Sequence, residues 1–426
     1  VAILLVWSFN GQAVAQDVKP LQAINENIAR IISNKPATAT LVPGEIQVAT
    51  LPAVVQWDDN GGRYAFNQLC DTLSSWGAEI KPSGIPLSKR YMQYLIGIKT
   101  KQGDPLADEE QRKYAETASK AEEAYSAERL RLLEAWNKLA KAESGLPEAN
   151  KTAYTTFMLQ NGGKLASFRI SALNAYSLWQ PSAQKAAPTT AGYILSGMQN
   201  FASRVKVKTY SGAEIDVLEC SPSIDLKRVL EDAATAVASN GHTADLKLSY
   251  GKRTGKIDSS WQNWGGGSGW GPFSVSANGS RSNVSVVTDN FSLTFEVPII
   301  IRFNLTRPWL DLSIVQTYKD TEIIQGSELD ALKPLFGEKG TFPLVPMEFI
   351  VGYKPRVIIK MDSSDYQATK SNYSAGGSFG VGPFRVGGGT SGGSNVENWD
   401  DQNHSITIGT QSNSFVLLGV RNRVLP

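Results

Sequence analysis

The chain has 426 residues, of which 41% are hydrophobic and 19% are charged, a composition typical of ordered globular domains. Its 42 basic and 40 acidic residues leave a net charge of only +2, which argues against a nucleic-acid groove or a polyanionic partner. The unusual components are 38 glycines and 10 tryptophans.

Residues 1–16 are predicted to be a signal peptide. Val1–Trp7 is an apolar run too short to span a bilayer, and Ala13-Val14-Ala15 has the small-x-small pattern of a cleavage site. No later apolar stretch reaches the roughly 20 residues of a transmembrane helix. We therefore expect a secreted, periplasmic or cell-surface protein, in which any membrane contact involves no spanning helix. The alternative is a buried N-terminal strand or short helix in a cytoplasmic protein.

The two cysteines, Cys70 and Cys220, are 150 positions apart. In an oxidising compartment they are candidates for a disulfide between the two halves of the chain. Their spacing alone leaves the pairing open, because disulfide geometry depends on the folded distance between the two residues.

Residues 17–200 are predicted to form a mostly helical domain with an antiparallel helical hairpin at 104–180. Leu106–Ala142 contains no proline or glycine, and apolar residues recur in it every three or four positions. Such a helix is roughly 55 Å long and needs a partner along its length, for which Leu146–Trp179 is the natural return arm. The apolar stripe is interpreted as the packing seam between the two helices, and the hairpin as a spacer or oligomerisation arm.

Residues 201–426 are predicted to form a β-rich domain, so the fold class is α+β. Short alternating runs of β-branched and aromatic residues begin near residue 203. One helix interrupts them at Ser223–Ala238, with Ser223 as its expected N-cap.

An internal repeat is the most informative feature of this half. Gly269–Val275 matches Gly380–Val386 at an offset of 111 positions, and both contain Gly-Pro-Phe. The repeat covers residues 245–303 and 357–420. We predict that each copy is a strand, a long glycine-rich β-hairpin and a returning strand, with Gly-Pro at a turn.

Several short motifs in this half follow one another in a recognisable order. They are Arg307-Pro-Trp-Leu310, Pro346-Met-Glu-Phe-Ile-Val351, Gly382-Pro-Phe384 and Phe415-Val-Leu-Leu418. Their order resembles that in a set of uncharacterised bacterial and fungal proteins, over roughly residues 245 to 420. The resemblance implies no activity.

Catalytic chemistry has little support in the sequence. The only histidines, His242 and His404, lie in unrelated contexts, and no nucleophile elbow, Walker loop, dinucleotide fingerprint or zinc spacing accompanies them. We therefore predict no catalytic residue, no cofactor and no metal site. A secreted hydrolase is the third and least favoured hypothesis.

The favoured hypothesis is a non-catalytic secreted or cell-surface protein that acts by binding or assembly through its twin hairpins. Aromatic rings among glycine, serine and asparagine can stack on sugars or anchor a protein interface, so a glycan or protein surface, or a second copy of the chain, is the expected partner. The alternative is that the rings pack over the sheet beneath them. The candidate binding residues are Trp261, Trp264, Trp270, Phe273, Tyr373, Phe379, Phe384 and Trp399.

The second hypothesis is a pore-forming or membrane-interacting protein, because two paired hairpins are what membrane insertion requires. A spanning strand needs about 9 to 11 residues with one continuous apolar face. Within Ser274–Asn283, Val275 and Ala277 are followed by Gly279 and Arg281. This strand alone is too polar, which places the hypothesis second.

Overall fold

The fold is taken from a computed structural model, and the predicted signal peptide lies outside the residues that it describes. These are residues 29, 44–49, 53–98, 105–186, 204–239, 244–251, 274–277, 280–282, 292–320, 322–323, 325, 327–374, 378–381, 384–386, 394–410 and 414–426. They form helices and antiparallel strands in several sheets, an α+β fold. Among the described helices, none has the length and hydropathy that crossing a bilayer requires.

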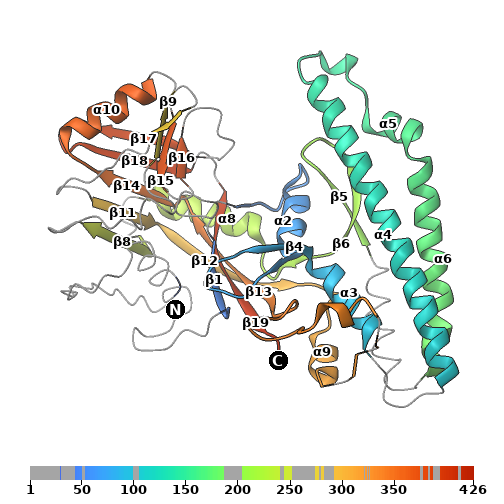
Figure 1. Cartoon of the computed structure of the whole chain (residues 1–426). Helices are drawn as coiled ribbons and strands as arrows, with labels where there is room; N and C mark the ends of the chain where they lie inside the picture. Colours follow the sequence, from blue (N-terminus) through green and yellow to red (C-terminus); the bar gives the residue numbers. More distant parts are fainter. Residues whose placement is uncertain are drawn as a thin grey trace.

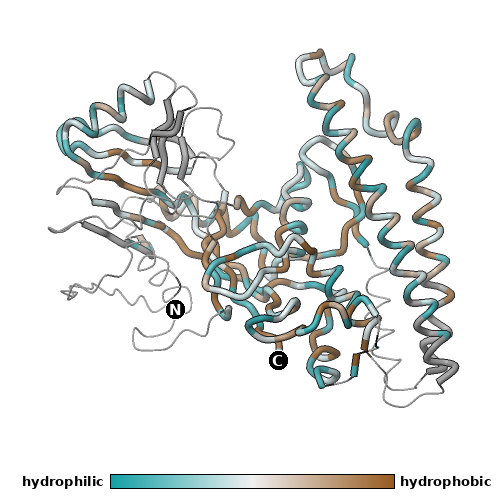
Figure 2. Tube along the Cα trace, in the orientation of Figure 1, coloured by the Kyte–Doolittle hydropathy of each residue, from teal (hydrophilic) through white to brown (hydrophobic). Residues whose placement is uncertain are grey.

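A central sheet runs through the middle of the molecule (Figure 1) and contains the most hydrophobic strands (Figure 2). Its main path has the order β1-β19-β13-β12-β7, and β2 also pairs with β19. These strands are β1 (Ile46–Val48), β2 (Val54–Val55), β7 (Ser221–Pro222), β12 (Ile299–Thr306), β13 (Leu344–Tyr353) and β19 (Phe415–Val424). Strands from both ends of the chain therefore share one sheet.

A second, five-stranded sheet continues the first. Its order is β17-β18-β14-β11-β8, and its strands are β8 (Leu246–Gly251), β11 (Ser292–Val297), β14 (Arg356–Lys360), β17 (Ser394–Asp400) and β18 (Ser405–Thr410). Only Pro298 separates β11 from β12, two residues separate β13 from β14, and four separate β18 from β19. The same three chain segments thus supply neighbouring strands to both sheets.

Helices α2 (Gly62–Cys70) and α8 (Leu226–Ala238) pack on the central sheet. The Phe66 ring contacts the rings of Phe303 and Phe349, with centroids 6.2 and 5.7 Å apart. The N-cap of α8 is Asp225, which accepts hydrogen bonds from the amides of Lys227 and Arg228.

The prediction of Ser223 as the N-cap of α8 was wrong. Its hydroxyl accepts a hydrogen bond from the amide of Asn304, and its own amide donates to the Asn304 carbonyl. Ser223 therefore extends the pairing beside β12, and the helix begins three residues later.

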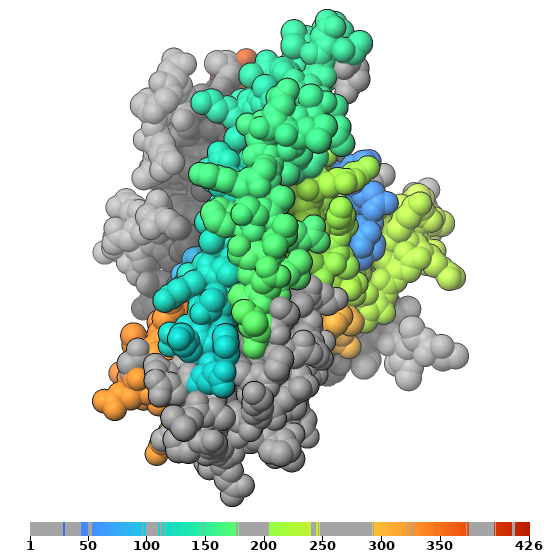
Figure 3. All heavy atoms as spheres, turned by 90° about the vertical axis from the view of Figure 1, so that its right-hand side faces the viewer, coloured from blue at the N-terminus to red at the C-terminus, as the bar shows by residue number. Residues whose placement is uncertain are grey.

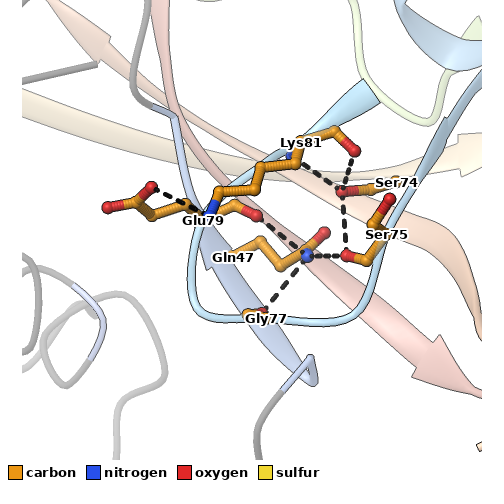
Figure 4. A network of polar contacts seen from close by, with 6 residues as sticks. All are labelled: Gln47, Ser74, Ser75, Gly77, Glu79 and Lys81. Atoms are coloured by element: carbon orange, nitrogen blue, oxygen red, sulfur yellow. Dashed lines mark hydrogen bonds and ion pairs between the residues drawn. The ribbon is translucent and has the colours of Figure 1, made fainter. Parts of the chain in front are cut away.

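One buried amide side chain of strand β1 holds a neighbouring loop against the sheet (Figure 4). The Gln47 Nε2 donates to the carbonyls of Ser75, Gly77 and Glu79 at 2.8, 3.2 and 3.1 Å. These carbonyls belong to the loop between β3 (Thr72–Ser74) and β4 (Pro82–Pro86). Because buried polar groups are costly when left unpaired, Gln47 fixes this loop against the sheet.

A helical arm lies along one side of the molecule (Figures 1 and 3). Helices α4 (Pro105–Ala142) and α6 (Gly163–Ala186) run side by side, with α5 (Tyr154–Asn161) between them in the chain. Strands β5 (Arg204–Lys208) and β6 (Glu214–Leu218) pair with each other and pack against α4. The indole of Trp136 in α4 donates a 2.7 Å hydrogen bond to the carbonyl of Ser211, in the β5–β6 turn.

A disulfide and a buried carboxylate connect the end of α2 to the segments around it. Cys70 at the end of α2 is bonded to Cys220. The next residue, Asp71, accepts hydrogen bonds of 2.7 Å from both the amide and the hydroxyl of Ser88, at the start of α3 (Leu87–Gly97). A carboxylate at this place satisfies free amides and suits the positive end of the helix.

Asp71 generates a testable pH dependence of stability. Burial raises its pKa to about 6, although the Ser88 hydrogen bonds and Arg307 oppose the shift. Since the folded carboxyl holds its proton more tightly than the unfolded one, with a pKa of about 3.9, its ionisation reduces stability as the pH rises from about 4 to about 6. We expect the wild type to lose about 2 kcal/mol of unfolding free energy relative to Asp71→Asn over this window, measured by urea denaturation. A constant difference between the two proteins from pH 4 to pH 7 would contradict this account.

Candidate functional site

The ends of four neighbouring strands of the five-stranded sheet lie in one row across the sheet. Gly251 at the end of β8 faces Ser292 at the start of β11, and Ser292 also faces Lys360 at the end of β14. Lys360 in turn faces Ser405 at the start of β18. The chain leaves the sheet along this line after β8 and after β14, and β11 and β18 start from the same line. After β14 the chain first re-enters the sheet as its edge strand β17, which then turns into β18.

We call the two departing segments the first excursion (252–291) and the second excursion (361–404). They are close in length, and their described parts pair with each other. Strand β9 (Ser274–Ala277) of the first pairs with β15 (Ser378–Val381) of the second. The flanking strands β10 (Ser280–Ser282) and β16 (Phe384–Val386) complete a four-stranded sheet of order β10-β9-β15-β16.

One buried carboxylate, paired with two cations, holds the register of the strands that lead to this row. The Glu296 carboxylate of β11 contacts Lys247 of β8 and Arg356 of β14, each at 2.8 Å, and its side chain is only 6% exposed. Burial acts to raise the pKa of Glu296, but the hydrogen bonds from the two cations outweigh it and lower the pKa. Because a one-residue slip would separate these charges, this ion triplet disfavours other registers.

The second excursion contains a helix, α10 (Ser363–Ser374), where the sequence predicted a strand–hairpin–strand unit. That prediction was wrong for this segment. Tyr366 of this helix is fully buried, and its hydroxyl donates a 2.8 Å hydrogen bond to Asp401 Oδ1. One turn later, Lys370 Nζ lies 2.6 Å from the same oxygen. We call Tyr366, Lys370 and Asp401 the α10 clasp.

The clasp shifts the acidities of its members in opposite directions. Burial, followed by the hydrogen bond to Asp401, raises the pKa of Tyr366 to about 12. Hydrogen bonds from Lys370 and Tyr366 lower the pKa of Asp401. Both shifts favour a neutral phenol donating to a carboxylate, so the clasp persists throughout the neutral range.

The β17–β18 turn that carries Asp401 is built by its own polar groups. Asp400 Oδ1 accepts hydrogen bonds from the amides of Gln402 and Asn403, both at 3.0 Å. His404 has a φ of 49°, and its ring lies 5.7 Å from that of Tyr366. These carboxylates therefore shape the turn. Nowhere in the described parts of the chain do three histidine, cysteine or acidic residues gather as metal ligands.

The aromatic candidates named from the sequence divide into two groups. Trp261, Trp264, Trp270 and Phe273, together with His242, lie outside the described residues. Tyr373 and Trp399 are half-buried against each other, with ring centroids 5.7 Å apart. Phe379 lies in β15 and Phe384 in β16, on paired strands.

Sequence reasoning missed the three residues of the clasp. The available signal was the absence of glycine and proline from Ser363 to Ser374, which permits a helix, and the i, i+4 spacing of Tyr366 and Lys370. Nothing local pointed to Asp401 as their common partner, because it lies 35 positions after Tyr366.

Comparison with known proteins adds no assignment: no family model, no curated protein and no solved structure matches the chain. The geometry of the strand row, the paired excursions and the clasp must therefore carry the functional argument.

The clasp predicts a stability effect. Tyr366→Phe keeps the packed ring but removes the donor to Asp401, so we expect the free energy of unfolding to fall by about 1 kcal/mol. Tyr366→Ala also leaves a cavity and should cost about 3–5 kcal/mol. Denaturant unfolding measures both, and Tyr210→Phe, at a tyrosine that is 64% exposed, is the control expected to change stability by less than about 0.5 kcal/mol. Equal effects of Tyr366→Phe and Tyr210→Phe would argue against the clasp.

Proposed function

We propose that the protein is non-catalytic and acts by assembly, as a homo-oligomer that inserts paired β-hairpins into a lipid membrane. In this proposal the two excursions leave their folded-back arrangement and extend the five-stranded sheet. The observation that carries the proposal is the strand register at the row of four ends. The secreted or cell-surface location expected from the N-terminal segment is compatible with such an activity.

The second excursion already has the register of an extended hairpin. Lys360 faces Ser405 in the β14–β18 pair, and Val381 faces Phe384 in the β15–β16 pair. The two residue numbers add up to the same total in both pairs. Strands β15 and β16 therefore have the pairing that a straight continuation of β14 and β18 requires, with its tip at Gly382-Pro383, a dipeptide suited to a turn.

Continuing the antiparallel register of β8 and β11 in the same way also places the tip of the first excursion at a Gly-Pro dipeptide. Gly251 faces Ser292, so a straight continuation of β8 and β11 turns between Gly271 and Pro272. The two Gly-Pro tips are the equivalent positions of the predicted repeat. Each arm then has about 20 residues and a length of roughly 65 Å, of which a membrane crossing uses about 9 to 11 residues.

The continued register also separates apolar from polar residues. Near the two tips, one face of the extended hairpins collects most of the apolar residues of both excursions: Trp264, Trp270, Phe273, Val275, Ala277, Tyr373, Ala375, Phe379, Val381, Phe384 and Val386. Arg281 shares this face, and Trp261 falls on the opposite one. The opposite face collects small and polar residues, among them Ser274, Ser276, Asn278, Ser280, Ser374, Ser378 and Arg385. An alternation of this kind is typical of strands with one side in lipid and the other in water.

Both hairpins place their apolar residues on the same side. Extending the register in which Ser292 faces Lys360 brings Phe273 opposite Phe379. This is the side on which Phe295 and Ile359 are already buried in the five-stranded sheet. The apolar side chains missing from one strand are thus supplied by its partners across the sheet, which answers the objection that a single strand is too polar.

The proposal requires several copies of the chain. Four strands in lipid leave two edges whose backbone groups have no partners, and each unsatisfied group costs several kcal/mol in hydrocarbon. A closed barrel removes these edges, and equivalent copies placed side by side can form one. Insertion of the hairpins is preceded by unwinding of α10, opening of its clasp, and separation of β17 from β18 and of β9 from β10.

Membrane insertion predicts opposite results for two neighbouring substitutions. Phe379→Asp places a charge on the proposed lipid face and should slow dye leakage from phosphatidylcholine–phosphatidylserine vesicles at least about tenfold. Ser378→Asp, on the water face, should leave leakage within about twofold of wild type. Gel filtration and thermal melting confirm that both variants are folded. Failure of the wild-type protein to release dye or to form oligomers on any vesicle would overturn the proposal.

A second experiment separates insertion from a static protein- or glycan-binding surface. Single cysteines from Gly377 to Val381 are labelled with an environment-sensitive fluorophore, while the native disulfide stays oxidised. On vesicles, residues 377, 379 and 381 should report a lipid environment and residues 378 and 380 water, because side chains alternate along a strand. A uniform response, or one that appears only with a glycan or protein ligand, would favour the binding surface instead.

A further inference from the structure

A cleft lies where the helical arm meets the body of the molecule. Its volume is about 420 Å³, and its walls come from α2, α3, α4, β5 and β6. It borders the Cys70–Cys220 disulfide. The insertion proposal makes no use of this cleft.

Two guanidinium groups from different elements enter the cleft. Arg129 of α4 donates to the backbone carbonyl of Asp216, and no carboxylate of the described residues lies within ion-pair distance of it. Arg204 of β5 pairs with Glu122 of α4. Burial, followed by the nearby charge of Arg204, lowers the pKa of Arg129. Arg204 therefore has a carboxylate partner, whereas Arg129 is held only by a backbone carbonyl.

The other acidic groups of the cleft are already engaged. Asp71 accepts both hydrogen bonds from Ser88, and Glu123 pairs with Lys89 at 2.9 Å. Neither carboxylate lies within ion-pair distance of Arg129, although the charge of Arg129 acts to lower the pKa of Asp71. A guanidinium has five donors, so Arg129 can hold an anion and keep its hydrogen bond to Asp216.

The rest of the cleft is largely apolar. Met92 of α3, Val217 and Leu218 of β6, and Trp309 line it beside the disulfide. A concave apolar wall with a few convergent polar groups is the usual form of a small-molecule site. The volume and the charge together define the ligand class.

We propose that this cleft binds a small organic anion with an apolar body, whose acidic group is held by Arg129 and Arg204. Such a ligand bridges α4 and β5 and so stiffens the joint between the helical arm and the sheet. The inference is independent of membrane insertion, since it concerns soluble protein and different residues.

Three ligands of equal chain length test the charge requirement. Decanoate, decanol and decylamine are titrated into the soluble full-length protein by calorimetry. We expect one decanoate per chain, bound at least about tenfold more tightly than decanol, because a charge-assisted hydrogen bond is lost with the alcohol. Decylamine should not bind. Equal binding of all three ligands, or no binding of decanoate, would overturn the proposal.

Variants locate the site. Arg129→Gln should weaken decanoate binding at least about tenfold, whereas Lys138→Gln, on an exposed part of the same helix, should leave it unchanged. Ser119→Phe fills the cleft from α4 and keeps both guanidinium groups, so it tests the site even if Arg129→Gln fails to fold. Wild-type affinity in a folded Ser119→Phe protein would show that decanoate binds elsewhere and would refute the assignment.

Discussion

The antiparallel register of three chain segments is the constraint on which the rest of the structure depends. Each segment crosses from the central sheet into the five-stranded sheet, as β12 and β11, β13 and β14, or β19 and β18. Because side chains alternate along a strand, a slip of one residue would expose Phe295 and Ile359 and bury their polar neighbours. The Glu296 ion triplet adds an electrostatic cost to the same slip.

This register connects the fold to the proposed function. The four strand ends form a row only because β8, β11, β14 and β18 are aligned residue by residue. The glycine- and serine-rich composition of the excursions gives little intrinsic preference for one packing, which suits segments that adopt two arrangements. In the described arrangement the α10 clasp and the β9–β15 pairing hold the excursions; in lipid, the proposed apolar face supplies the opposing free energy.

The helical arm has a different relation to the sheet. Its helix α4 contacts the β5–β6 hairpin through polar groups and α3 through the ion pair of Glu123 with Lys89, and the Cys70–Cys220 disulfide lies just after β6. The proposed anion site lies at this joint, where Arg129 and Arg204 approach from two elements. The molecule thus combines a sheet whose register is strongly specified with an arm whose attachment contains an incompletely neutralised charge.

Local sequence determined those elements whose signals lie within a few residues of one another. The bounds of α4 follow from Pro105 and from Ser144-Gly145, and the α+β class follows from the change in hydrophobic period. Tertiary structure decided the rest: the helix α10, the cap of α8, the partners of Arg129 and the row of strand ends. Each of these depends on groups that are distant in the sequence, as Tyr366 is from Asp401 or Ser223 from Asn304. Periodicity encodes which face of an element is apolar, but only the folded chain determines which polar groups meet, because the free energy of burying such a group depends on the partner that it finds.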